Sequence, residues 1–212
     1  MLDFDWHIGT PRLYISHLNP SNDVHCDFLI EYMKNRELDS KLEDMSRSMS
    51  KREAIAKLQI EPRMARMEAS GWGRYLVSLK PPSTDENDVD KPFSERRFEP
   101  VGCVTMQLAR FPGGPTVPDI GFSFLDRYQG KGYATEAAQR LMKYFEEERG
   151  QKGFLGVTDL DNENAKKMFR RLGFKDRGVR DVNGLIEGKP LTSSIWSLGL
   201  EGDLEQYGFD PQ

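Results

Sequence analysis

The sequence predicts an α+β fold, an α/β arrangement built on one mixed sheet, and three observations lead to this prediction. Short segments of alternating or continuous apolar residues, typical of strands, occur along the whole chain. Longer segments carry apolar residues at helical spacing, most regularly from 133 to 148. The order is strands, helices, several strands and then β-α-β-α-β-β, which favours helices packed on a mixed sheet. The length of 212 residues suits one domain over 1–212.

The first part of the chain is expected to place helices between two strands. A first strand is predicted at Leu13-Tyr14-Ile15. Helices are predicted over 23–29 and over 38–59, and we expect Pro62 to end the second of these. A further helical segment is predicted over 64–69. Alternation of apolar and polar residues over 75–79 predicts a half-buried strand.

The middle of the chain is predicted to form a hairpin. Residues 81–92 are rich in proline and acidic residues and offer little to bury, so we predict an exposed hairpin loop over 81–97. The returning strand is predicted over 98–110, with the apolar positions Val101, Cys103 (or Val104), Met106 and Leu108. After a turn at 112–115, residues 119–125 are nearly all apolar and predict a central, buried strand.

The last part alternates helices and strands. The helix over 133–148 has one continuous apolar face, formed by Ala134, Ala137, Ala138, Leu141, Met142 and Phe145. A strand over 154–157 precedes a helix that begins at Asp161-Asn162, and Gly173 occupies the position where a helix commonly ends. Strands are predicted from 174 and over 194–200. The acidic tail 201–212 is predicted to be a loose end.

Composition excludes several classes of protein. The net charge of −4 argues against a nucleic-acid binder, which needs a basic face. The two cysteines form no CxxC or Cys/His cluster, so we expect no metal site, and their rarity fits a reducing compartment. No apolar run of about 18 residues predicts a membrane span. The N-terminus has no basic region followed by an apolar core, so we expect no signal peptide and a cytoplasmic protein.

The loop Arg127-Tyr128-Gln129-Gly130-Lys131-Gly132 is the segment most informative about function. It follows a buried strand and precedes the long helix. The first turn of a helix presents unpaired N–H groups and a partial positive charge, and glycines let an anion come close to the backbone. This arrangement binds a pyrophosphate. Lys131, Arg127 and Arg170 could add cationic contacts to the phosphates.

Other phosphate-binding motifs fit this loop less well. A P-loop requires Ser or Thr after its lysine, whereas Gly132 follows Lys131. A dinucleotide fingerprint requires a third glycine where this chain has Thr135, and it opens the first βα unit of its domain. The remaining alternative is a glycine turn that only starts a helix.

The same residues resemble a known family. The segment Arg127-Tyr128-Gln129-Gly130-Lys131-Gly132-Tyr133-Ala134-Thr135-Glu136-Ala137 resembles the R/Q-x-x-G-x-G/A signature of the GNAT superfamily of N-acetyltransferases, and specifically its RimJ/RimL-like branch. A second block, Asn162-Glu163-Asn164-Ala165 followed by Gly173-Phe174, resembles the N-x-x-A/S … G-F element of that family. Thr10-Pro11-Arg12-Leu13 resembles the first strand of the branch. Residues 20–97 match only in outline.

The resemblance implies a GNAT fold, with a mixed, mostly antiparallel sheet of six to seven strands flanked by helices. It also implies acetyl-CoA as co-substrate, without a metal. The strand through Phe122 and Phe124 would then bind the pantetheine arm, and the amides from Gln129 to Ala134 would bind the pyrophosphate. The expected cofactor-binding residues are Phe124, Arg127, Gln129, Gly130, Lys131, Gly132, Tyr133, Ala134, Asn162 and Arg170.

Acetyl transfer to an amine requires that the amine lose its proton before it attacks. Asp119 is the candidate base, because it begins the strand that leads to the glycine loop, where family members often carry a carboxylate; the alternative is an aspartate that only begins a strand after Pro118. Ser123 shares the face of Asp119 and either orients a water or packs. Phe169 is a departure, since many members of the family have a tyrosine there that protonates the leaving thiolate.

Several alternatives stay open at this point. The chain could hold acyl-CoA without turnover, as a regulatory module, or it could acetylate a protein N-terminus or a surface lysine. The acceptor is an amine of a small molecule or a peptide, with no nucleic-acid or membrane partner expected, and the protein is a monomer or a homodimer. The three histidines are expected to have solvated or structural roles, and Cys103 to be a small core residue.

Overall fold

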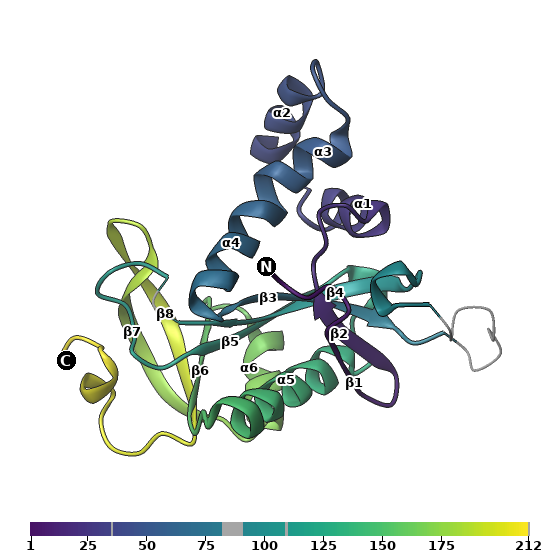
Figure 1. Cartoon of the computed structure of the whole chain (residues 1–212). Coiled ribbons are helices and arrows are strands. Elements are labelled where there is room, and N and C mark those ends of the chain that lie inside the picture. Colours follow the sequence, from purple (N-terminus) through teal and green to yellow (C-terminus); the bar gives the residue numbers. More distant parts are fainter. Residues whose placement is uncertain (35, 82–90, 109, 212) are drawn as a thin grey trace. The chain divides into compact units, whose positions relative to one another are not determined.

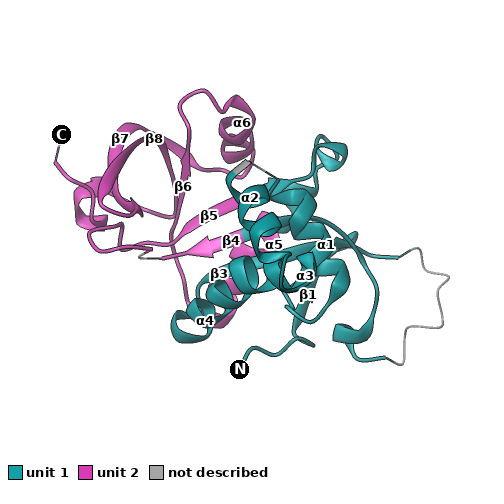
Figure 2. Ribbon diagram, turned by 90° about the horizontal axis from the view of Figure 1, so that it is seen from above, with its two compact units in different colours: residues 1–104, 123–137 teal, residues 105–122, 138–212 magenta. Residues whose placement is uncertain are grey.

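The computed structural model describes residues 1–34, 36–81, 91–108 and 110–211. They form two compact units, shown in Figure 2: residues 1–104 with 123–137, called unit 1, and residues 105–122 with 138–212, called unit 2. Strands β4 and β5 and helix α5 each contribute residues to both units. One domain over 1–212 therefore stays a prediction.

Unit 1 begins with two short strands, continues with helices and then returns to strands. Its elements before β5, with all of β4 included, are β1 His7–Gly9, β2 Leu13–His17, α1 Asp23–Tyr32, α2 Arg36–Met45, α3 Lys51–Ile55, the π-helical turn η1 Ala56–Ile60, α4 Glu61–Ser70, β3 Gly73–Leu79, the 3-10 turn η3 Phe93–Glu95 and β4 Glu99–Gln107.

The elements from β5 onward follow along the rest of the chain. They are β5 Asp119–Phe124, the 3-10 turn η4 Asp126–Tyr128, α5 Tyr133–Arg149, β6 Phe154–Thr158, α6 Glu163–Arg171, β7 Lys175–Ile186, β8 Lys189–Leu198 and the 3-10 turn η5 Leu204–Tyr207. The predictions for α5, β6 and α6 are confirmed to within one or two residues at each end.

The strands form one mixed sheet in the order β1-β2-β3-β4-β5-β6-β8-β7. The pairs β1–β2, β2–β3, β6–β8 and β7–β8 are antiparallel, whereas β5 and β6 are parallel, with Asp119 opposite Leu155. The mixed, mostly antiparallel sheet is therefore confirmed. It has eight strands rather than six to seven, and the strand that the sequence analysis missed is β1, whose three residues include a single buried one.

Helices cover both sides of the strands in unit 1. Helices α1 to α4 lie on one side of β2 and β3, and the first turn of α5 lies on the other (Figure 1). Strand β3 is accordingly buried on both faces rather than half-buried, with Tyr75, Leu76, Val77 and Ser78 all inaccessible. The core beneath the helices includes Leu29, Leu42, Ile55, Leu76 and Cys103, which confirms Cys103 as a small core residue.

The helical segments between β2 and β3 differ from the prediction. The single helix expected over 38–59 is divided at Ser50, whose side chain caps α3 and forms a reciprocal capping box with Glu53. Pro62 does not end a helix, because helical residues continue from 51 to 70. It lies in the first turn of α4, directly after the π-helical turn. A proline is tolerated in the first turn of a helix, because the N–H group that it lacks is not required there.

Two segments expected to be loose are partly packed. Residues 82–90 of the predicted hairpin loop lie outside the described residues, but Phe93 in the same loop is buried and stacks on His7 at 3.9 Å between ring centroids. The tail after Glu201 is not a loose end. Its Leu204 and Phe209 are buried in unit 2, and the backbone N–H of Thr116 donates to the carbonyl of Tyr207 at 2.9 Å.

The histidines have the structural roles expected of them. His17 stacks on Trp6 at 4.6 Å, and Nδ1 of His25 accepts from the backbone N–H of Asn19 at 3.0 Å. Burial lowers the pKa of His25 to about 4, so its ring is neutral at physiological pH.

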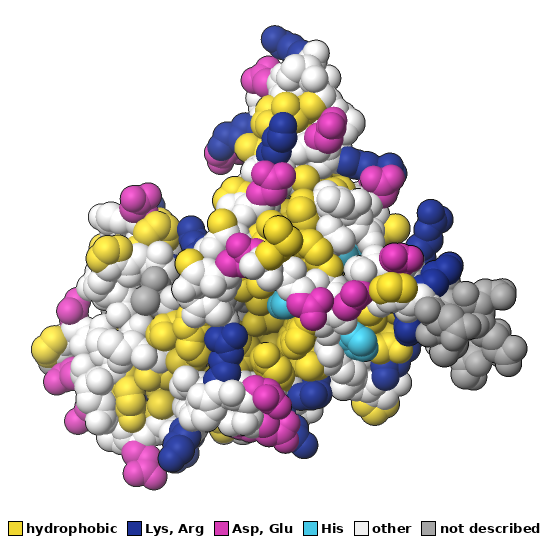
Figure 3. Space-filling model, viewed as in Figure 1, with side chains coloured by type: hydrophobic (Ala, Val, Ile, Leu, Met, Phe, Trp, Pro, Cys, Tyr) yellow, Lys and Arg dark blue, Asp and Glu magenta, His cyan; other side chains and the backbone are white. Residues whose placement is uncertain are grey.

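On the face shown in Figure 3, acidic and basic side chains of the described residues are interspersed. Within the parts of the chain that the structure describes, no helix has both the length and the apolar character needed to cross a bilayer.

Candidate active site

The glycine loop has the backbone geometry that an anion site requires. Gly130 and Gly132 have φ angles of 74° and 80°, in the left-handed region that glycine adopts without strain. The N–H of Glu136 donates to the carbonyl of Gly132 at 3.1 Å, which opens α5. The amides of the three preceding residues therefore have no carbonyl partner within the helix. They form the positive end of a 17-residue helix.

Side-chain hydrogen bonds hold the turn between β5 and the glycine loop. Nε2 of Gln129 donates to the carbonyl of Phe124 at 3.2 Å and to Oδ1 of Asp126 at 2.8 Å, so this side chain closes the turn after β5. Tyr128 is buried, and its hydroxyl donates to the carboxylate of Glu99. That hydrogen bond raises the pKa of Tyr128. The backbone N–H of Gln129 donates to the carbonyl of Asp126 at 3.1 Å, so the amide and the side chain of this residue are both engaged within the turn.

The two cations of the loop are in different situations. Arg127 donates through both terminal nitrogens to the carboxylate of Glu31 on α1. This pairing lowers the pKa of Glu31 and raises that of Arg127. Lys131 is exposed, takes part in none of the ion pairs of the described residues, and lies with Nζ 5.3 Å from the centre of the Tyr128 ring. Lys131 is therefore better placed than Arg127 to bind a phosphate.

A network around Glu136, which sequence reasoning did not identify as functional, ties the loop to the start of β2. The carboxylate of Glu136 accepts from Oγ1 of Thr10 at 2.5 Å, from the backbone N–H of Arg12 at 3.1 Å and from Nε of Arg12 at 2.7 Å. Nη1 of Arg12 also donates to the carbonyl of Lys131 at 3.0 Å, and the guanidinium lies 4.6 Å from the centre of the Tyr133 ring. Arg12 thus holds the loop from outside the helix.

The residues of this network lie in segments that carry the family resemblance, although nothing in the sequence indicates that they meet. Thr10 and Arg12 belong to one of the three segments and Glu136 to another. Burial raises the pKa of Glu136, but the hydrogen bonds from Thr10 and Arg12 outweigh burial and leave the pKa below its usual range. The carboxylate is therefore charged at neutral pH and holds both partners.

The expected cofactor residues of unit 1 are brought together, because Phe124 to Ala134 form one continuous segment. Asn162 and Arg170 belong to unit 2. Asn162 caps α6, with Oδ1 accepting from the backbone N–H of Ala165 at 3.0 Å. Arg170 is exposed and lies 5.1 Å from the centre of the Trp196 ring. Both keep N–H groups that a ligand could use.

Phe169 belongs to the core of unit 2, as expected. It is 1% exposed, contacts Phe122 edge-on at 5.5 Å and stacks on Trp196 at 5.9 Å. A Cβ atom on Gly156 would come within 2.4 Å of its ring. This position therefore supplies packing and no proton donor.

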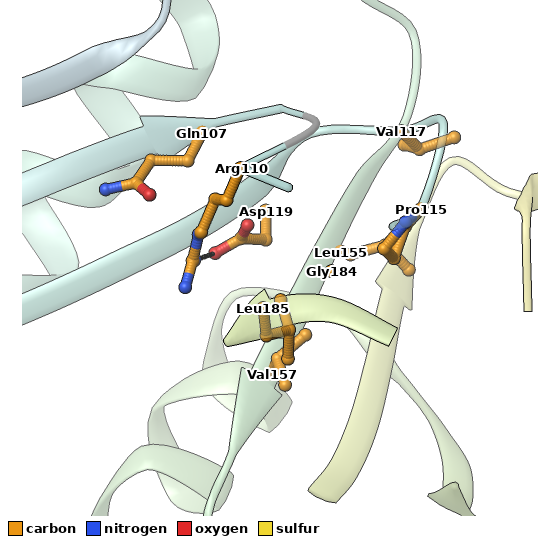
Figure 4. Close-up of a pocket in the computed structure, with 9 residues that line it drawn as sticks. All are labelled: Gln107, Arg110, Pro115, Val117, Asp119, Leu155, Val157, Gly184 and Leu185. Atoms are coloured by element: carbon orange, nitrogen blue, oxygen red, sulfur yellow. Dashed lines mark hydrogen bonds and ion pairs between the residues drawn. The ribbon is translucent and has the colours of Figure 1, made fainter. Parts of the chain in front are cut away.

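Asp119 lies in a small hollow of unit 2, shown in Figure 4. Its carboxylate points toward Arg110 and forms an ion pair with it, beside Gln107, Val157 and Leu185. Burial raises the pKa of Asp119 above its usual range, and the guanidinium of Arg110 opposes only part of that rise. A buried carboxylate with a raised pKa is a stronger base than an exposed one.

Ser123 is exposed, so it does not serve as a packing residue. In unit 1 it lies within hydrogen-bonding reach of the hydroxyl of Tyr32, which also reaches Cys103. The chain's two cysteines are both buried and free. Burial raises the pKa of each thiol to about 11, so neither is a thiolate at neutral pH.

Comparison with known proteins identifies the family of this site. A family model described as an acetyltransferase (GNAT) domain matches residues 12–175, which is more than half of the chain. No curated protein matches the sequence.

Solved structures share the fold at low sequence identity. RimL, a ribosomal L7/L12 alpha-N-protein acetyltransferase in complex with coenzyme A, has a TM-score of 0.61 at 16% identity, over 93% of this chain and 100% of its own. Microcin C7 self immunity acetyltransferase MccE, in complex with acetyl-CoA and AMP, has a TM-score of 0.60 at 15% identity, over 90% and 94%. A ribosomal-protein-S5-alanine acetyltransferase from Vibrio fischeri has a TM-score of 0.59 at 15% identity, over 91% and 96%.

Proposed function

This chain belongs to the GNAT family of acetyltransferases, and we propose that its glycine loop binds acetyl-CoA for direct transfer of the acetyl group to a primary amine. The acceptor is an amine of a small molecule or of a peptide. The observation that carries the proposal is the loop before α5, where Gly130 and Gly132 take the left-handed conformation and leave the first amides of the helix unpaired. Such amides bind a pyrophosphate, which acetyl-CoA supplies.

Direct attack is supported by the state of the cysteines. A covalent acetyl-enzyme requires an activated nucleophile such as a thiolate. Cys26 and Cys103 are the only cysteines of the chain, and both are buried with pKa values raised to about 11. Neither thiol is therefore an activated nucleophile at neutral pH, which supports attack of the amine on the thioester while both substrates are bound.

Asp119 is the residue that we propose as the base. Because burial raises its pKa, its carboxylate accepts a proton more readily than an ordinary aspartate does. The guanidinium of Arg110 is the charged partner of Asp119, and it stays beside the carboxyl group whether or not that group is protonated. We assign Ser123 to the orientation of a water or of the amine, since it is exposed and offers a hydroxyl.

A regulatory module that binds acyl-CoA without turnover is the second candidate, and Phe169 is the observation that favours it. A buried phenylalanine cannot protonate the leaving thiolate. The two candidates agree on the cofactor and differ only in the release of free coenzyme A.

The test is a measurement of coenzyme A release from acetyl-CoA, with a thiol reagent, over a panel of small and peptide amines. We expect release with at least one amine, and intersecting double-reciprocal lines when both substrates are varied. Parallel lines would instead indicate a covalent acetyl-enzyme. Binding of acetyl-CoA without release for any amine would favour the regulatory module.

We also propose a cytoplasmic location for this activity. The two cysteines are free and buried rather than paired, as is usual in a reducing compartment.

A further inference from the structure

Two arginines of unit 1 share one hollow that the glycine loop does not use. Arg63 on α4 and Arg74 on β3 both line it, and its other walls are apolar, formed by Leu18, Ile60 and Met67 among others. Both arginines are half-buried. Apolar walls exclude water and so strengthen any charge interaction that takes place inside.

The positive charge of this hollow has no protein counter-ion. None of the ion pairs of the described residues includes Arg63 or Arg74. Nη1 of Arg63 donates only to the carbonyl and the side-chain oxygen of Gln59. Nη1 of Arg74 reaches only the sulfur of Met33, at 3.7 Å, and its Nε is buried without a hydrogen-bond partner among the described residues.

Two half-buried guanidiniums without a counter-ion destabilise the folded protein unless an anion binds between them. A buried polar atom without a hydrogen-bond partner loses its bonds to water and gains none in exchange. Burial lowers the pKa of Arg63 to about 10, and the neighbouring cations Arg74 and Arg66 add to that lowering. The guanidinium nevertheless stays charged at neutral pH. Two charged guanidiniums in one partly buried, largely apolar hollow are the donor set that a carboxylate or phosphate takes.

The hollow is connected to the candidate catalytic face through Tyr32. The guanidinium of Arg74 lies 5.9 Å from the centre of the Tyr32 ring. The hydroxyl of the same tyrosine lies within reach of Ser123 on β5. All of these residues belong to unit 1. A ligand held by the arginines would therefore lie on the side of the sheet that presents Ser123.

We propose that Arg63 and Arg74 form a subsite for an anionic group of the acceptor, so that the substrate is an amine that also carries a carboxylate or a phosphate. This inference rests on the proposed function, since it assigns the acceptor of that reaction. The guanidiniums bind and orient the acceptor and take no part in proton transfer. The glycine loop remains the site of the pyrophosphate.

The first experiment compares matched amines in the coenzyme A release assay. Phosphoethanolamine is compared with ethanolamine for the phosphate, and two peptides that differ only in glutamate or glutamine at their second position are compared for the carboxylate. The variants are Arg63→Gln and Arg74→Gln. The matched control is Lys57→Gln, which removes one positive charge from an exposed position on the adjoining helical turn η1, outside the hollow.

We expect one anionic amine to be preferred over its neutral partner. Each of the two variants should raise KM for the anionic amine roughly 10- to 100-fold, the loss expected for hydrogen bonds to a charged group, and should leave the neutral amine unaffected. The control should change KM less than about twofold, since exposed charges contribute little. The inference is wrong if neither anionic amine is preferred, or if the preference survives in both variants.

A second readout separates this inference from the proposed reaction. The melting temperature is measured with inorganic phosphate against chloride at equal ionic strength, in protein saturated with coenzyme A so that the glycine loop is occupied. Phosphate should stabilise the wild type and the Lys57 control but neither of the two variants. The variants should melt no lower than the wild type without phosphate, because they relieve repulsion. If phosphate has no effect, or the same effect in all four proteins, the subsite does not exist, whether or not turnover is found.

Discussion

The substitution Glu136→Gln tests whether the network around Thr10 and Arg12 holds the glycine loop. The carboxylate accepts two hydrogen bonds at Oε1, from Thr10 and from the backbone of Arg12, and Oε2 accepts from Nε and Nη2 of Arg12 at 2.7 and 2.6 Å. Glutamine retains one acceptor oxygen and turns an amide N–H₂ group toward donors. The variant therefore loses about half of these interactions.

The magnitude follows from the burial of the two partners. Hydrogen bonds to a charged group contribute about 1.5–3 kcal/mol each. Because the Arg12 side chain is 48% exposed and that of Glu136 is 18% exposed, solvent screens part of this. We expect a net loss of about 2–3 kcal/mol, or roughly 4–12 °C in melting temperature for a chain of this size. Affinity for acetyl-CoA should also fall, roughly 5- to 30-fold, because Arg12 no longer holds the carbonyl of Lys131.

The assay is thermal unfolding from about pH 4 to pH 8, with calorimetric titration of acetyl-CoA. The pKa of Glu136 is lower in the folded protein than its ordinary value of 4.5. The stabilisation is therefore fully present above about pH 4.5 and is lost as the pH falls through the lowered pKa. Glu163→Gln, in the first turn of α6 and paired with Lys166, is the matched control, and its melting temperature should stay close to that of the wild type because exposed ion pairs contribute little. Equal melting temperatures for wild type and Glu136→Gln would refute the reasoning.

Three further predictions concern the loop, the base and the core. Gly132→Ala should lower the stability by about 1–2 kcal/mol and weaken acetyl-CoA binding in calorimetric titration, because the φ of 80° disfavours a side chain; unchanged affinity would mean that the loop geometry does not matter. Asp119→Asn should lower kcat/KM roughly 100- to 10,000-fold. In the pH–rate profile, wild-type activity should rise with pH around a pKa above the ordinary aspartate value, and the variant should lack this rise. If the variant keeps the rise, Asp119 is not the base. Phe169→Tyr should lower the free energy of unfolding in urea by about 1–3 kcal/mol, since its hydroxyl would be buried against Gly156 and Trp196; a faster reaction without loss of stability would contradict this.

The features predictable from the sequence were those that local chemistry determines. Gly130 and Gly132 are needed for their backbone conformation, and this need is visible in the residues themselves. Helix α6 was predictable because Asn162 caps it and its apolar residues share one face. Phe169 was correctly assigned to the core on the same basis.

The features missed were those that depend on distant parts of the chain. Arg12 and Glu136 are 124 residues apart, and no periodicity predicts that they meet. Arg63 lies on α4 and Arg74 on β3, and they line one hollow only because α4 folds back on β3. The sequence predicted that Pro62 would end the helix just before Arg63. The packed tail is similar, since Leu204 and Phe209 are isolated apolar residues whose partners lie elsewhere in unit 2.

The most direct test of the central claim, that the glycine loop binds the pyrophosphate, is the melting temperature with acetyl-CoA against acetyl-pantetheine, which lacks the pyrophosphate. The variant is Gly130→Glu, and Gly188→Glu is its control, because both glycines have a φ of 74° and open space around them, so that only the site of the new carboxylate differs. At about 100 times Kd, acetyl-CoA should stabilise the wild type and Gly188→Glu by about 2.7 kcal/mol, or roughly 5–11 °C, with a much smaller effect of acetyl-pantetheine. Gly130→Glu should lose the response to acetyl-CoA. An equal response in all three proteins, or an equal response to the two ligands, would contradict the claim.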